Sequence, residues 1–198
     1  MKSMPHTLLK IHLTKIRHMT KILWMMKTSS PKNWTGLILF LNRGDNLTTY
    51  DDLLIEADCN NLVTKEKPLR ANKGRIKGNR IAIRKDLTQT EKKCVLAEEL
   101  GHHYTATGNI LDQSTVENRK QEMRGRIVAY NKLVGLRGII DAYLHHCQSL
   151  SETAEYLGVT EEFLNDSLTY YTNKYGVCTQ VDNYVIFFQP NIGVMELI

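Results

Sequence analysis

Three residues in one short stretch have the types and spacing to hold a metal ion and to move a proton. The stretch LAEELGHHYT, at positions 96–105, contains Glu98, Glu99 and His102. Residues four apart lie on the same face of a helix, so Glu98 and His102 can bind one ion. In the zinc motif H-E-x-x-H, two histidines at this spacing hold the metal and the intervening glutamate takes a proton from bound water. The pattern here is E-E-x-x-H.

The flanking segments make a family resemblance specific. LAEELGHHYT, preceded by NRIAIRKDLTQTEKKC and followed by NRKQEMRGRIVAYNKLV, resembles the ImmA/IrrE family of zinc metallopeptidases, and closely its phage and mobile-element branch. The resemblance begins at about Thr48 and implies an intracellular zincin-like protease that cuts an Xre-type repressor, releasing genes of a prophage or integrative element. It implies Glu98 as first metal ligand, Glu99 as general base, His102 as second ligand and Glu122 as third ligand.

One departure from the family pattern concerns the metal. This chain has Glu98 where the common motif has histidine, and two carboxylates with one imidazole make a harder, more oxygen-rich site. Zinc is the implied cofactor, while weaker zinc binding, occupation by Mn²⁺ or Fe²⁺ and loss of catalysis are left open. His103 is four residues from Glu99, but it projects about 100° away from His102 and remains an outside candidate.

Context decides between a metal site and a solvated helix face. Glu and His pairs at i, i+4 also occur on exposed helices, where each contributes about 0.2–0.5 kcal/mol. A capped helix, Glu122 on a second capped helix 20 positions beyond His102, and Gly101, where side-chain bulk would crowd the site, favour the metal site. The adjacent His145 and His146 face different directions and are interpreted as a surface or packed pair.

Two other segments suggest binding to macromolecules. Residues 149–171 have the rhythm of a helix-turn-helix, but the second helix carries Glu161, Glu162 and Asp166 and no base before Lys174. A helix that enters a DNA groove needs positive charge, so we expect no direct DNA binding and a role in packing or in contacting a protein substrate. Nine Lys or Arg residues between positions 65 and 85 could hold an acidic partner, although a solvated face is the preferred interpretation.

Start and stop signals predict an α+β fold with a zincin-like core, a small β hairpin and a helical C-terminal region. A first helix is expected over residues 50–63, capped by Thr48 or Thr49, and Gly78-Asn79 supplies the turn of a hairpin over 75–84. A capping box at Thr88 opens a helix over about 89–103. A second capping box at Ser114 opens a helix that runs to about 133. Further helices are expected over 138–147, 149–158 and 160–174, with a strand over 184–189.

Charge and cysteine spacing bound the class of protein. The net charge of +5 comes from the first 50 residues, which hold eight Lys or Arg and one acid, whereas the remainder holds 18 bases and 20 acids. The four cysteines form no C-x-x-C pair, which indicates reduced thiols in a cytoplasm. No segment has the roughly 20 apolar residues of a transmembrane helix.

Three regions are expected. Residues 1–47 form a basic, poorly ordered extension, with a membrane-surface helix as the alternative. Residues 48–147 form the metallopeptidase domain and 148–198 a helical region with a terminal strand. The preferred function is metal-dependent cleavage of an Xre-type repressor; the alternative is a catalytically inactive repressor-binding or toxin-antitoxin partner on the same fold.

Overall fold

The computed structural model describes residues 47–105 and 115–197, all of which belong to the compact unit Asp45–Ile198. The expectations for residues 1–46, for the loop at Gly108 and for the Ser114 capping box lie outside the described residues. No helix in the described part is long and apolar enough to cross a membrane.

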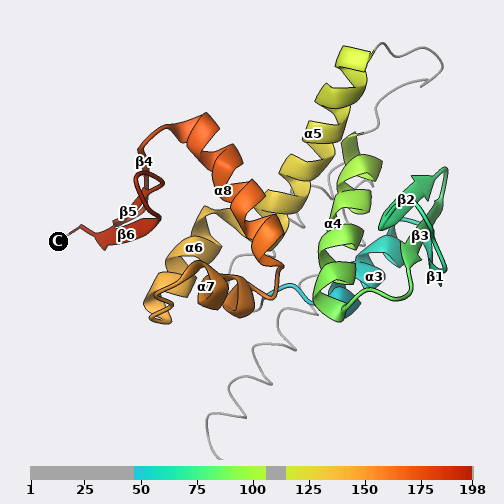
Figure 1. The fold of residues 1–198 in the computed structure, drawn as a ribbon, viewed down its shortest axis with the longest axis horizontal. Coiled ribbons are helices and arrows are strands. Elements are labelled where there is room, and N and C mark those ends of the chain that lie inside the picture. The colour runs from blue at the N-terminus through green and yellow to red at the C-terminus, as the bar shows by residue number, and fades with distance from the viewer. Residues whose placement is uncertain (1–46, 106–114, 198) are drawn as a thin grey trace, which may run out of the picture. The chain divides into compact units, whose positions relative to one another are not determined.

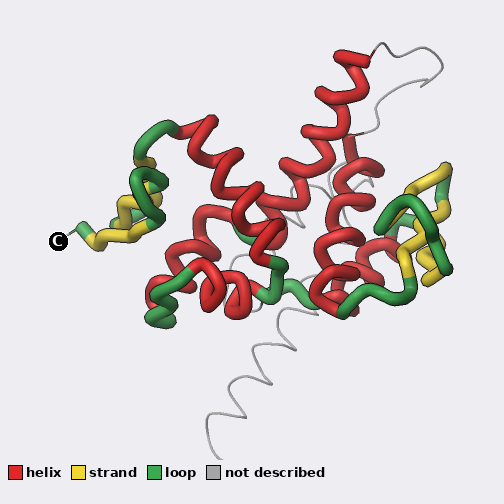
Figure 2. The backbone as a smooth tube through the Cα atoms, in the orientation of Figure 1, coloured by secondary structure: helices red, strands yellow, loops and turns green. Residues whose placement is uncertain are grey.

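Figures 1 and 2 show a mixture of helices and short strands. In chain order they are α3 (Tyr50–Cys59), β1 (Val63–Lys67), β2 (Gly74–Lys77), β3 (Arg80–Arg84), α4 (Gln89–Thr105), α5 (Thr115–Leu133), α6 (Gly135–Leu144), α7 (Leu150–Leu157), α8 (Glu161–Tyr175), β4 (Cys178–Val181), β5 (Tyr184–Phe187) and β6 (Gly193–Glu196).

The first helix begins where the sequence predicts and ends earlier. Thr49 caps α3 in a capping box with Asp52, whose carboxylate accepts the Thr49 backbone N–H at 2.8 Å. The prediction that the helix reaches Val63 is wrong, because α3 ends at Cys59 and Asn61 takes a left-handed conformation with φ of 57°. Asparagine tolerates that conformation, which reverses the chain. Val63 then begins β1.

The predicted hairpin is confirmed as β2 and β3, which pair antiparallel around the Gly78 turn. The sequence did not predict β1, which pairs parallel with β3 and gives the strand order β1-β3-β2. The segment VTKEK has a single large apolar residue and lacks the alternation that marks a half-buried strand. Ile81 and Ile83 of β3 are fully buried, so one face of the sheet contributes to the core.

The motif helix α4 is confirmed and ends two residues later than expected. Thr88 and Glu91 form the capping box, with the Thr88 N–H donating to the Glu91 carboxylate at 2.9 Å. Val95, Leu96 and Leu100 are buried as predicted. The following helix, α5, ends at Leu133 as expected and carries Glu122. Helices α4 and α5 pack directly on each other (Figure 1).

The C-terminal helices α7 and α8 begin at their predicted caps, whereas the bounds of α6 differ from the prediction. Ser149 caps α7, Gly158 ends it with φ of 61°, and Thr160 caps α8. Helix α6, however, begins at Gly135 and ends at Leu144, so the predicted range of 138–147 is wrong by three residues at each end. Gly135 has a positive φ of 57°, which lets the chain turn directly from α5 into α6.

The last three strands of the described chain form a second sheet. The strand predicted over 184–189 is β5, and β4 and β6 pair antiparallel on either side of it. These two four-residue strands alternate poorly in polarity and were not predicted. Ile186 is fully buried and joins the same core as Ile83, Leu96 and Leu164. The described fold is therefore α+β, as predicted.

Candidate active site

Two glycines bring α4 and α5 close enough to place their polar side chains together. A Cβ atom added to Gly101 would overlap the backbone oxygen of Gly125, and one added to Gly125 would overlap the His102 ring. The two helix backbones therefore touch where both lack a side chain. The sequence predicted that a side chain at Gly101 would crowd the site. In the structure, such a side chain would collide with the backbone of α5 instead.

His102 and Glu122 meet across this contact. Nε2 of His102 lies 3.4 Å from Oε2 of Glu122, and the His102 side chain is 21% exposed. The other Glu122 oxygen, Oε1, accepts from Nε of Arg126 at 3.2 Å. The structure thus brings together two residues that the family resemblance implies as ligands. Arg126 was missed from the sequence, although its i, i+4 spacing from Glu122 is a recognisable signal.

Glu99 lies on the buried side of α4, against β2. It is 9% exposed, and a Cβ atom added to Gly74 would approach its Oε1 to 2.8 Å. Burial, and after it the charges of the nearby Glu98 and Glu122 carboxylates, raise the pKa of Glu99 to about 7 against the opposing effect of a hydrogen bond from the Ile76 backbone. A carboxylate whose pKa is near neutrality can both accept and return a proton.

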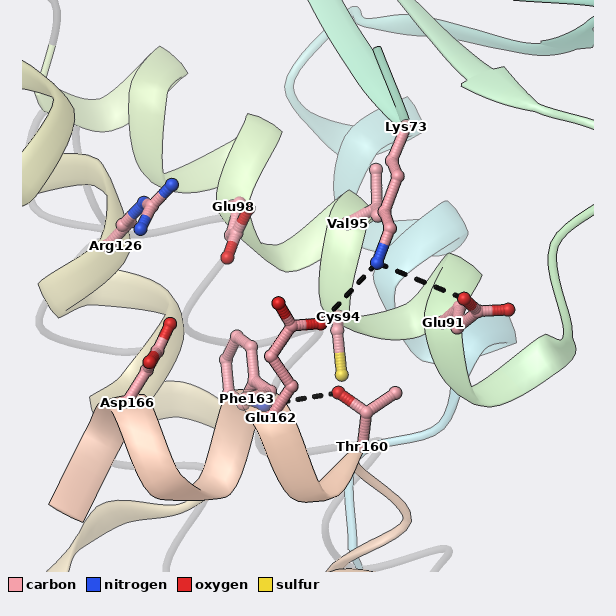
Figure 3. A pocket seen from close by; sticks show the side chains of 10 residues that line it. All are labelled: Lys73, Glu91, Cys94, Val95, Glu98, Arg126, Thr160, Glu162, Phe163 and Asp166. Carbon is pink, nitrogen blue, oxygen red and sulfur yellow. Dashed lines mark hydrogen bonds and ion pairs between the residues drawn. The ribbon is translucent and has the colours of Figure 1, made fainter.

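Glu98 faces a cavity of about 230 Å³ between α4, α5 and the start of α8 (Figure 3). Burial raises the pKa of Glu98, the Arg126 guanidinium lowers it, and Glu122 and Asp166 raise it. The helix-turn-helix-like segment therefore contributes to the site through α8. The cavity is lined by Lys73, Glu91, Cys94, Val95, Glu98, Arg126, Thr160, Glu162, Phe163 and Asp166.

The donor atoms of His102 and Glu122 match part of the geometry of a metal site. Ligands in a zinc tetrahedron with bonds of about 2.0–2.1 Å lie about 3.3 Å apart, which the His102–Glu122 distance of 3.4 Å matches. Within residues 47–105 and 115–197, no three His, Cys, Asp or Glu side chains stand close enough to hold an ion together. Two donors therefore fit, and Glu98, one helical turn from His102, is positioned in the cavity near Arg126.

The other histidines of the described residues lie outside the His102–Glu122 pair. His103 packs edge-on against Tyr104 with ring centroids 5.5 Å apart. His145 packs against Tyr156 with centroids 4.5 Å apart, and His146 follows it in a turn with φ of 62°. These contacts agree with the interpretation of His145 and His146 as a surface or packed pair.

Comparison with known proteins identifies the family. A peptidase family model described as the IrrE N-terminal-like domain matches residues 57–169. No curated protein and no solved structure matches the chain. The matched segment is more than half of the chain and includes Glu98, Glu99, His102 and Glu122. Such a domain has a zincin-like fold, and its metallopeptidase chemistry implies a metal ion and a protein substrate. The chain therefore belongs to the peptidase family of the IrrE N-terminal-like domain.

Proposed function

We propose that this protein is a zinc-dependent endopeptidase that cleaves an Xre-type transcriptional repressor of a prophage or mobile element. The observation that carries the proposal is the His102–Glu122 pair at ligand spacing, with the buried Glu99 three positions before His102 on α4. Family membership supports a peptidase, and the identity of the repressor substrate rests on the resemblance of the motif segments. We place the reaction in the cytoplasm, where such a repressor acts.

Each polar residue has a separate role in this proposal. Glu98, His102 and Glu122 would hold the ion, and Mn²⁺ or Fe²⁺ is an alternative to zinc because Glu98 replaces the usual histidine. When bound, the ion lowers the pKa of water and polarises the peptide carbonyl. Glu99 takes the proton of the attacking water on its carboxylate and delivers it to the leaving amine. Its pKa of about 7 suits both steps.

The test measures metal content and cleavage separately. Zinc content is measured in the parent and in His102→Ala and Glu122→Ala variants, and fragments of purified Xre-type repressors are sought by mass spectrometry. Near-stoichiometric zinc that is lost in both variants supports the ligand set. Cleavage that falls at least 100-fold in Glu99→Gln, and not in the control Glu155→Gln at an exposed position of α7, supports the role of Glu99.

The second candidate is a binding protein on the same fold, either an inactive repressor binder or a toxin-antitoxin partner. Two observations favour it: Glu98 occupies the usual histidine position, and the described residues contain no three-donor group. This candidate predicts that the metal-free parent binds the repressor without cutting it. Loss of the repressor only when Glu99 is intact would exclude it.

A further inference from the structure

Strand β2 separates two different surfaces. Gly74 closely approaches the Glu99 carboxylate, which also accepts a hydrogen bond from the Ile76 backbone, and these two residues are the less exposed ones of β2. Arg75 and Lys77 alternate with them and are exposed on the opposite face of the sheet. One four-residue strand therefore links the candidate active site to the outer surface.

The strand register gathers six cations on that outer surface, which we name the basic face. Lys67 pairs with Arg84, Lys77 pairs with Arg80, and Ala82 lies between Lys65 and Arg75. Directly paired residues point to the same side of a sheet, about 5 Å apart across strands and about 6.6 Å apart along one strand. The basic face consists of Lys65, Lys67, Arg75, Lys77, Arg80 and Arg84.

Within the part of the chain that the structure describes, acids pair with just one of the six cations of the basic face. Among the described residues, Arg84 pairs with Asp86 at 3.2 Å, and the other five make no ion pair. Glu66, the acid within β1, points to the other side and holds Lys92 at 2.9 Å. Five like charges at these distances repel one another, and an anion bound among them would relieve that repulsion.

The shape of the face indicates what kind of anion fits. A hollow of about 340 Å³ is lined by three of these cations, Lys65, Lys67 and Arg80, and by Val63, Asn79, Ile81 and Ala82. The basic face has no aromatic side chain on which the bases of a single strand could stack. Outside the basic face, residues 51–198 hold 20 acids against 12 bases, so this part of the chain has no net positive charge that would favour an extended polyanion. A short acidic peptide segment needs only the face itself.

We propose that the basic face binds an acidic segment of the protein substrate, next to the segment presented to Glu99. This proposal rests on the proposed peptidase function for the identity of the partner. Glu99 lies against β2, which is the edge strand of its sheet, and Arg75 and Lys77 of the same strand belong to the basic face. A substrate chain at Glu99 can therefore extend around this edge to the basic face. Binding there raises the local concentration of the scissile segment without touching the reacting atoms.

The test uses the full-length protein and fluorescence anisotropy, without cleavage. The probes are a labelled ten-residue peptide of alternating Glu and Ser, the same peptide with Gln for Glu, and a 12-base-pair DNA duplex. The variant is Lys65→Gln/Lys67→Gln/Arg80→Gln. The matched control removes the same charge elsewhere, as Lys120→Gln/Arg137→Gln/Lys174→Gln, on α5, α6 and α8.

We expect the Glu peptide to bind the parent and the control, with Kd at least tenfold higher for the basic-face variant and no binding of the Gln peptide. Equal weakening by both triple variants, tighter binding of the duplex than of the peptide, or no binding of the Glu peptide would overturn the proposal. Since neither metal nor cleavage enters the measurement, such a failure is distinct from a failure of the proposed peptidase function.

Discussion

The α4–α5 pair and the C-terminal helices α6, α7 and α8 are packed in different ways. Helices α4 and α5 touch through Gly101 and Gly125, with backbone against side-chain-free backbone. Helices α7 and α8 are joined through buried apolar side chains, among them Leu157 and Leu164. Gly138 of α6 faces only the end of the Leu157 side chain, which an added Cβ would approach to 3.1 Å.

The two regions also differ in the kind of polar group that they bury. In the C-terminal helices they are the hydroxyls of Thr153 and Ser167, each donating to a carbonyl of its own helix. On α4, Glu99 is buried with its pKa raised, beside a second perturbed carboxyl at Glu98. The removal of side-chain bulk between α4 and α5 lets ionisable groups of two helices meet, and the region packed by apolar side chains has no such cluster among the described residues.

The largest expected effect comes from adding one methyl group at the α4–α5 contact. In Gly101→Ala the new Cβ meets the Gly125 backbone, which cannot rotate away, so we expect a loss of about 3 kcal/mol or more in the free energy of unfolding, and loss of zinc binding. Gly138→Ala is the matched control, because Leu157 can change rotamer and alanine favours a helix, and it should stay within about 1 kcal/mol. Urea unfolding and zinc titration measure both. Similar losses in the two variants would contradict the comparison.

A smaller effect is expected from pH. The pKa of Glu99 rises from 4.5 to about 7 on folding, so the folded protein holds this proton more tightly than the unfolded chain. The resulting stability is fully present below pH 4.5 and is lost as pH rises through about 7, by up to about 3 kcal/mol. Glu98, whose pKa is also raised, acts in the same direction.

This expectation is checked by urea unfolding of metal-free protein between pH 4.5 and 8. The Glu99→Gln variant cannot ionise at this position, so its stability should fall less over that range than the stability of the parent. Parallel pH profiles for the two proteins would show that Glu99 is not the source. The difference between the two profiles separates Glu99 from the other groups of the protein that titrate in this range.

Local signals in the sequence predicted the elements that carry the site. Thr88 with Glu91, Ser149 and Thr160 begin helices by bonds to backbone within three residues, so their patterns can be read directly. Gly78-Asn79 likewise specified its turn. The early end of α3 depended on a left-handed Asn61, which adjacent residues favour but do not require.

Long-range packing explains what the sequence did not reveal. Strand β1 is held by its parallel pairing with β3, seventeen positions further on in its register, and its polar residues give no sign of that partner. The roles of Gly74 against Glu99 and of Gly125 against His102 depend on contacts between separate elements. The motif drew attention to Glu98, Glu99 and His102, and the family resemblance added Glu122, whereas the position of Arg126 near the carboxyls of Glu98 and Glu122 required the fold.

The smallest expected effect concerns Arg126, the cation already present among the candidate ligands. Its Nε binds Glu122 at 3.2 Å, and its charge lowers the pKa of Glu98. A zinc ion held by the same carboxylates must compete with this guanidinium. An ion pair as exposed as this one contributes about 0.2–1 kcal/mol, so Arg126→Met should tighten zinc binding by only about two- to fivefold.

Arg137→Met provides the matched control in the other region, because Arg137 makes the same i, i+4 contact with Asp141 at 3.1 Å on α6. Its zinc affinity should equal that of the parent in calorimetric titration. Weaker zinc binding by Arg126→Met would mean that Arg126 holds Glu122 in place for the metal instead of competing with it. The direction of the change in zinc affinity therefore distinguishes a competing cation from a positioning residue. Both possibilities concern the same turn of α5, which carries the candidate ligand Glu122 and the positive charge of Arg126.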